Sequence, residues 1–153
     1  MSAGKQFCTF YLDDRMFGID VLKIQEVLRA QPTTEVPLAP AEIRGLINLR
    51  GSIVSTLDLR RRFALPPLPP HILPTNVVAQ TPTGLISLLV DRIGDVVEVN
   101  QADFEKPPET LGGCARAMID GVYKLPSGLL LVLNVEKTLD LESNRTHGNI
   151  QLP

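Results

Sequence analysis

The sequence predicts a mainly β fold made of two similar small β units, each closed into a barrel of five or six strands. Most apolar stretches are short, rich in β-branched residues and separated by glycine, proline or aspartate, a pattern typical of short strands. An ungapped shift of 76 residues aligns Gly45 with Gly121 and Ile53 with Leu129, which indicates an internal repeat. Barrels are favoured because closure protects short strand edges from pairing with other chains.

The apolar stretches predict nine strands, and turn-forming residues such as Arg50-Gly51 separate several of them into hairpins. The predicted strands cover residues 7–12, 16–19, 45–49, 53–57, 76–80, 85–90, 95–99, 118–123 and 129–134. Three short helices are also expected. Asp20 caps the first, in which Val21, Ile24 and Val27 are three residues apart on one face. The second covers residues 59–63 and the third residues 135–141, each directly after a strand.

The chain is expected to form one domain over residues 1–141, with subdomains at about 7–65 and 75–141. Between them, residues 66–74 hold five of the 13 prolines. Such a segment can be a polyproline ligand for an aromatic-lined groove, but a stiff connector between two halves is the favoured interpretation. Residues 142–153 are polar and lack periodicity, which predicts a disordered tail.

Composition and charge argue against several classes of protein. The net charge of −2 does not favour nucleic acid as a partner, because affinity for phosphates needs a basic excess. No apolar leader follows Met1, and the longest aliphatic run, 129–133, is far shorter than the roughly 20 residues that span a bilayer. A cytoplasmic protein without membrane insertion is therefore expected. Cys8 and Cys114 fit no metal-binding spacing, so reduced thiols are favoured.

No motif in the sequence predicts catalysis. Both histidines, His71 and His147, lie outside the predicted strands and helices, and no nucleotide-binding loop or nucleophile elbow is present. We therefore expect no catalytic residues, no metal and no cofactor. The alternative is a small metal-dependent enzyme that uses the acidic cluster around Asp91 and Asp95, although a solvated strand face is the favoured interpretation.

The segment 36–60 carries the densest signal. It predicts a proline-braced turn followed by a hairpin whose turn is Arg50-Gly51. Gly51 can adopt a positive φ without a Cβ penalty, and Arg50 then projects a planar fork of donors that suits a carboxylate. Within this segment, Gly-Leu-Ile-Asn-Leu-Arg-Gly at 45–51, a hydrophobic strand and Asp-Leu-Arg at 58–60 closely resemble the CheW family pattern. Residues 18–27, 90–96 and 131–137 are also similar to that family, so the resemblance extends over about residues 7–141.

The resemblance implies a single CheW-like domain of two SH3-like, five-stranded β-barrels packed side by side. It also implies a non-enzymatic adaptor that couples methyl-accepting chemoreceptors to a CheA-type histidine kinase in chemotaxis, associated with membrane-bound receptor arrays. The partners would be the cytoplasmic tip of the receptors and the regulatory domain of the kinase, for which no binding residues are identified. An adaptor of a non-flagellar, type IV pilus pathway is the alternative within the family. The receptor-binding residues carried over are Ile24, Glu26, Val27, Gly45, Asn48, Arg50 and Gly51.

Structural alternatives apply to these residues. Glu26 and Arg50 could form a salt bridge that pins a helix to the hairpin, and Ile24 and Val27 could belong to the core. The chain also departs from the family pattern at two positions: Ser55 stands where proline is frequent, and Arg92 where glycine is frequent. The serine loses rigidity rather than a contact. Arg92 bears on the edge between the two halves.

Overall fold

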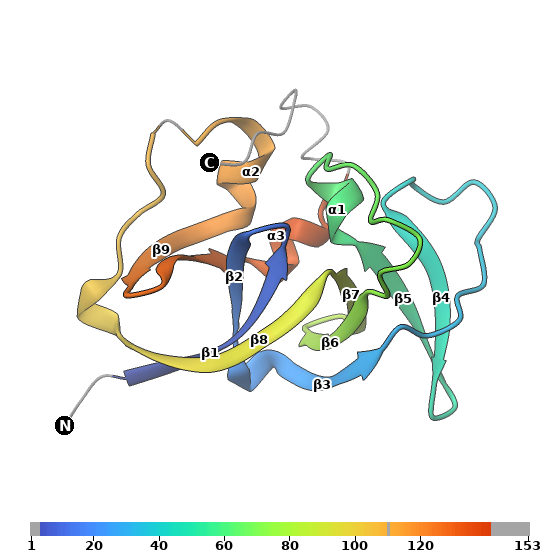
Figure 1. The fold of residues 1–153 in the computed structure, drawn as a ribbon. Coiled ribbons are helices and arrows are strands. Elements are labelled where there is room, and N and C mark those ends of the chain that lie inside the picture. The colour runs from blue at the N-terminus through green and yellow to red at the C-terminus, as the bar shows by residue number, and fades with distance from the viewer. Residues whose placement is uncertain (1–3, 110, 142–153) are drawn as a thin grey trace.

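The computed structural model describes residues 4–109 and 111–141, and this part of the chain is mainly β (Figure 1). The described strands are β1 Gly4–Leu12, β2 Arg15–Asp20, β3 Ile24–Arg29, β4 Ile43–Leu49, β5 Ser52–Asp58, β6 Thr75–Thr81, β7 Gly84–Val90, β8 Arg92–Asn100, β9 Ile119–Leu125 and β10 Gly128–Leu133. The helices are the 3-10 helices η1 Val21–Lys23 and η2 Gln101–Asp103, and the α-helices α1 Leu59–Arg62, α2 Gly113–Met118 and α3 Val135–Leu139.

The strands form two five-stranded sheets. One, which we name the terminal sheet, has the order β8-β1-β2-β10-β9 and contains strands from both ends of the chain. The other, the central sheet, has the order β3-β6-β7-β5-β4 and uses consecutive strands from the middle of the chain. Neighbours are antiparallel except for the β2–β10 and β5–β7 pairs, which are parallel. The predicted mainly β fold with two five-stranded units and short helices is confirmed.

Each sheet is closed by a backbone bridge between its two outer ends. In the central sheet, the segment after β3 reaches β4, where Thr34 and Leu46 exchange hydrogen bonds of 2.9 and 2.8 Å. In the terminal sheet, Glu105, which follows β8 and η2, exchanges bonds of 3.0 and 2.8 Å with Val122 of β9. Each bridge joins the two edges of its sheet at one point and so shortens the edge that a five-stranded sheet would otherwise expose.

The internal repeat is present in the structure, but it does not divide the chain into two independent barrels. β4, β5 and α1 recur as β9, β10 and α3 at an offset of 76 residues. However, β1 and β2 pair with β8 and β10, while β6 and β7 pair with β3 and β5. Each sheet therefore contains strands from both predicted subdomains, 7–65 and 75–141. The predicted subdomain boundaries do not coincide with the two sheets. The connector 66–74 likewise joins α1 to β6 within the central sheet rather than joining two halves.

A continuous hydrophobic core unites the two sheets. Phe17 of the terminal sheet packs against Phe63, which follows α1, with ring centroids 5.4 Å apart. α1 and α3 meet as well, because the buried Arg62 donates a 2.8 Å hydrogen bond to the carbonyl oxygen of Thr138. A smaller cluster fills the other side of the terminal sheet. Its members are Phe7, Met16, Val99, Tyr123, Leu130 and Val132.

The predicted helix around Val21, Ile24 and Val27 is wrong. Asp20 does cap a turn, accepting a 3.0 Å hydrogen bond from the Leu22 amide, but that turn is the three-residue helix η1. β3 follows, and its side chains alternate between partly buried and exposed. Three apolar residues spaced by three do not distinguish a helix from a turn that leads into a strand.

The other predicted elements agree within a few residues, but the described helices η2 and α2 were not predicted. α1 and α3 occur where they were expected, because Asp58 and Asn134 accept hydrogen bonds from the amides of Arg61 at 3.3 Å and Lys137 at 2.9 Å. No capping residue indicates α2 in the sequence, because its N-cap is Gly112, which has no side chain to accept a hydrogen bond. The predicted tail 142–153 lies outside the described residues. Among the described helices, none is both long and apolar enough to cross a membrane.

Candidate protein-binding surface

The β4–β5 hairpin presents Arg50 at its tip. Leu49 pairs with Ser52, so Arg50 and Gly51 form a two-residue turn with φ values of 50° and 88°. Two consecutive positive φ values define a type I′ turn, whose twist matches that of the strands beside it. The Oδ1 atom of Asn48 accepts a 2.9 Å hydrogen bond from the Gly51 amide and fixes the turn. The tip is thus preorganised by Asn48 and Gly51.

Arg50 forms an ion pair with Glu26 of β3. β3 and β4 are the two outermost strands of the central sheet, so this pair crosses the seam at which the barrel closes. The Arg50 side chain is 76% exposed, whereas that of Glu26 is 17% exposed. Exposed ion pairs contribute only about 0–1 kcal/mol to folding. The pair therefore positions the accessible guanidinium without contributing much to the stability of the fold.

Gly45 supports the same seam from inside the barrel. A Cβ atom at this position would lie 2.5 Å from the carbonyl oxygen of Thr34, the residue that makes the closing bridge. Its φ of 151° also favours glycine. Gly121, the equivalent residue in the terminal sheet, is similarly constrained, since its Cβ would lie 2.6 Å from the Glu105 carbonyl oxygen. Gly45 is buried at this seam.

The aliphatic candidates differ in exposure. Ile24 is partly buried and packs against the main core, which agrees with the structural alternative for this residue. Val27 is 40% exposed beside Glu26 and is available to a partner. Two exposed residues were missed by sequence reasoning: Leu22 of η1 at 89% and Ile53 of β5 at 66%. The alternation of the hairpin could have identified Ile53, because it pairs with the exposed Asn48 on the adjacent strand.

The acidic cluster has a structural explanation at Asp91. The Arg60 guanidinium donates to Asp91 Oδ2 at 2.6 Å and to Asp13 Oδ1 at 2.8 Å, and the Asp13 amide donates to the same Asp91 oxygen at 2.7 Å. Burial lowers the pKa of Arg60, but the hydrogen bonds and charges of the two carboxylates outweigh it and raise that pKa above its usual value. Among the described residues, no three His, Cys, Asp or Glu side chains are grouped so that they could hold a metal ion.

This Arg60 cluster joins the two sheets. Arg60 belongs to α1, Asp13 to the β1–β2 turn, and Asp91 to the link between β7 of the central sheet and β8 of the terminal sheet. The Arg60 and Asp91 side chains are only 9% and 10% exposed. Arg92, which stands where the family pattern often has glycine, lies next to this link. Its guanidinium carbon lies 3.7 Å from the centroid of the Tyr11 ring, on which it stacks.

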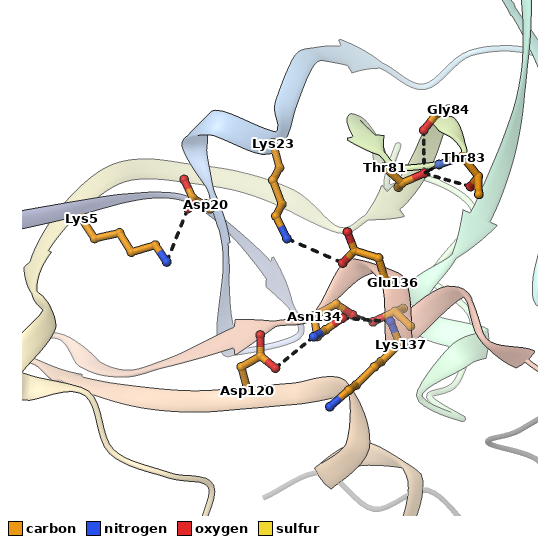
Figure 2. Close-up of polar contacts among 11 residues, drawn as sticks. Lys5, Asp20, Lys23, Thr81, Thr83, Gly84, Asp120, Asn134, Glu136 and Lys137 are labelled. Carbon is orange, nitrogen blue, oxygen red and sulfur yellow. Dashed lines mark hydrogen bonds and ion pairs between the residues drawn. The ribbon is translucent and has the colours of Figure 1, made fainter.

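The second link between the sheets carries a weaker contact. Figure 2 shows Lys23 of η1, which connects β2 to β3, reaching Glu136 of α3 at 3.6 Å. Both side chains are more than 40% exposed. In the same view Asn134, which caps α3, donates a 3.1 Å hydrogen bond to Asp120 of β9. A buried ionic cluster at one link and an exposed ion pair at the other thus supplement the shared core.

Fold and surface together define a two-barrel binding module that displays an ion-paired hairpin and exposed aliphatic side chains. The chain belongs to the CheW-like domain family of chemotaxis scaffolds, because the family's profile matches residues 6–143.

Curated relatives agree with this assignment. The chain is 30% identical over 149 residues to the chemotaxis protein CheW of Treponema pallidum, covering 95% of this chain and 88% of that protein. It is 28% identical over 149 residues to CheW of Klebsiella aerogenes, covering 97% of this chain and 90% of that protein. The fold is similar to the crystal structure of the scaffolding protein TtCheW from Thermoanaerobacter tengcongensis, with a TM-score of 0.81 at 22% identity over 99% of this chain and 100% of that one.

Proposed function

We propose that this chain is a non-enzymatic cytoplasmic adaptor that couples methyl-accepting chemoreceptors to a CheA-type histidine kinase. The observation that carries the proposal is the Glu26–Arg50 pair, which holds a largely exposed guanidinium on a rigid hairpin at the barrel seam. This geometry suits a carboxylate of a protein partner, since a guanidinium recognises carboxylates with paired donors. Membership of a family of chemotaxis scaffolds supports this role.

The receptor-facing surface comprises residues that contact the partner and residues that shape the surface. Arg50, Glu26 and Val27 would contact the helical tip of the receptor, with the exposed Ile53 and Leu22 extending the apolar part. Gly45, Asn48, Gly51 and the partly buried Ile24 would hold these side chains in place. An amphipathic helix could lay its apolar face on the aliphatic side chains while a polar residue meets Arg50.

The kinase regulatory domain would bind elsewhere on the two barrels, so that receptor and kinase are held at the same time. Signal transfer then requires that the receptor's states interact differently with the assembled complex, because a ligand shifts an equilibrium only by its differential affinity. The chain itself would contribute geometry and no catalysis.

A titration of the protein against the isolated kinase regulatory domain and, separately, against a receptor cytoplasmic fragment tests the proposal. We expect saturable binding to both, with Arg50→Ala losing receptor binding and keeping kinase binding. Arg116→Gln is the matched control, because Arg116 is an exposed arginine on α2, outside the proposed surface. Failure of the folded wild-type protein to bind either partner would refute the adaptor function, and normal receptor binding by Arg50→Ala would refute the assigned surface.

A further inference from the structure

A hollow of about 440 Å³ lies beneath the proline-rich segment 66–74, on the central sheet. Its walls combine this segment with residues from β4, α1 and the end of β7. Its charged lining residues are Arg44, Asp58, Arg60, Arg61 and Asp91, and Ile72 and Leu73 are two of its aliphatic ones. The proposed receptor-facing surface contains none of them.

The proline-rich segment is held in place over the hollow. Arg60 Nε donates a 2.6 Å hydrogen bond to the carbonyl oxygen of Pro66, and the Ile72 amide donates to the carbonyl oxygen of Pro69 at 3.0 Å. Proline fixes φ at the intervening positions, so the wall loses little conformational entropy when a partner binds. Ile72 and Leu73 are 41% and 77% exposed, so this wall presents two adjacent aliphatic side chains to a partner.

Among the charged side chains that line the hollow, Arg60 is paired with Asp91 and with Asp13, which leaves Arg44 and Arg61 beside the single carboxylate of Asp58. Arg44 and Arg61 both contact the same oxygen of Asp58, at 3.4 and 3.5 Å, and their side chains are 46% and 50% exposed. Arg61 also donates to the carbonyl oxygen of Ala41 at 3.0 Å. Each guanidinium has five donors, so both retain donors that face solvent beside the exposed aliphatic side chains.

We propose that this hollow is a second protein-binding surface, which takes an acidic segment carrying aliphatic side chains. A carboxylate of the segment binds Arg44 and Arg61, and its aliphatic side chains pack on the proline wall with Ile72 and Leu73. Arg44 lies near the start of β4 and Arg50 in the turn just after its end, about 20 Å away at roughly 3.3 Å per residue, so both surfaces can be occupied at once. The inference does not depend on which partner binds the Glu26–Arg50 surface.

The test is an NMR titration of the full chain with a short peptide of alternating leucine and glutamate, beside the same peptide with glutamine in place of glutamate. We expect amide shifts at residues that line the hollow and none at the β4–β5 turn, with the glutamine peptide binding more weakly. Arg44→Gln combined with Arg61→Gln should weaken binding about tenfold, as expected from the loss of a charge-assisted hydrogen bond, while Arg116→Gln should not change it.

Several outcomes would overturn this inference. They are equal binding of the two peptides, shifts confined to the Glu26–Arg50 surface, and unchanged affinity in the double variant. A Leu73→Ser variant gives an independent check, because its exposed side chain can be replaced without affecting the core. This variant should bind the peptide more weakly and keep its thermal unfolding midpoint. Undiminished binding would show that the apolar part of the proposed surface does not contact the peptide. If a short oligonucleotide but not the acidic peptide bound the hollow, the ligand class would be wrong.

Discussion

Replacing Arg60 with methionine should destabilise the protein strongly, because it leaves Asp91 without its cationic partner. The Asp91 side chain is 10% exposed and that of Asp13 is 45% exposed, so Asp13 can be hydrated and Asp91 cannot. Removing one partner of a buried ion pair costs about 3–5 kcal/mol. Since only one of the two carboxylates is trapped, we expect a loss of about 3 kcal/mol in the free energy of unfolding.

Urea unfolding followed by circular dichroism measures this loss. With a denaturant slope of about 2 kcal/mol per molar, a loss of about 3 kcal/mol lowers the midpoint by roughly 1.5 M. Arg61→Met is the matched control, since Arg61 lies on the same helix with a half-exposed side chain and should cost less than about 1 kcal/mol.

A double variant separates loss of the ion pair from loss of packing. Arg60→Met combined with Asp91→Leu removes both buried charges, and replacing a buried pair by apolar residues is often close to neutral. The double variant should therefore recover most of the stability that Arg60→Met loses. A single variant that loses less than about 1 kcal/mol, or a double variant as unstable as the single one, would refute the assignment of Arg60 as the ionic joint between the sheets.

Three further predictions concern Gly45, Arg50 and Cys8. Gly45→Ala should cost about 2 kcal/mol or more in thermal unfolding because its Cβ meets the Thr34 carbonyl oxygen, whereas Gly51→Ala, with open space around it, should cost about 1 kcal/mol; equal losses would contradict the seam argument. Arg50→Ala should change the unfolding free energy by less than about 1 kcal/mol, so a larger loss in urea titration would show a structural role. Burial raises the pKa of the Cys8 thiol above its ordinary value, so the unfolded state ionises first and stability should fall as pH rises above about 8.5. Cys8→Ala should remove that part of the pH dependence, measured by urea midpoints between about pH 7 and pH 10, and an unchanged slope would count against it.

Local chemistry made the hairpins and two of the helices predictable from the sequence. Arg50-Gly51 requires a tight turn, and Asp58 and Asn134 are helix-capping residues placed directly after strands. Strand partners could not be predicted in the same way, because the apolar pattern of β1 or β6 shows that it is a strand and not which neighbour it joins. The exchange of β1 and β2 between the two repeats therefore appears only in three dimensions.

The candidate surface shows a similar division. The Glu26–Arg50 pair was reached through resemblance to a family, since nothing in the local sequence brings β3 to the tip of a hairpin 24 residues away. The predicted helix also does not explain why the adjacent residues Glu26 and Val27 differ in exposure, whereas the alternation of strand β3 does. The resemblance places Gly45 among the binding residues. The steric reason for glycine there comes from the structure, in which an added Cβ atom would lie 2.5 Å from the Thr34 carbonyl oxygen.

The exchange of strands between the two sheets has a consequence for synthesis on the ribosome. All the strands of the central sheet lie within residues 24–90, so it can assemble as soon as that stretch emerges. The terminal sheet needs β9 and β10, which are made about 40 residues later, a delay of roughly 2–8 s at about 5–20 residues per second. During that interval Phe10 and Phe17 of β1 and β2 have no β10 to complete their sheet. The N-terminal hairpin therefore waits for the C-terminal strands before its sheet is complete.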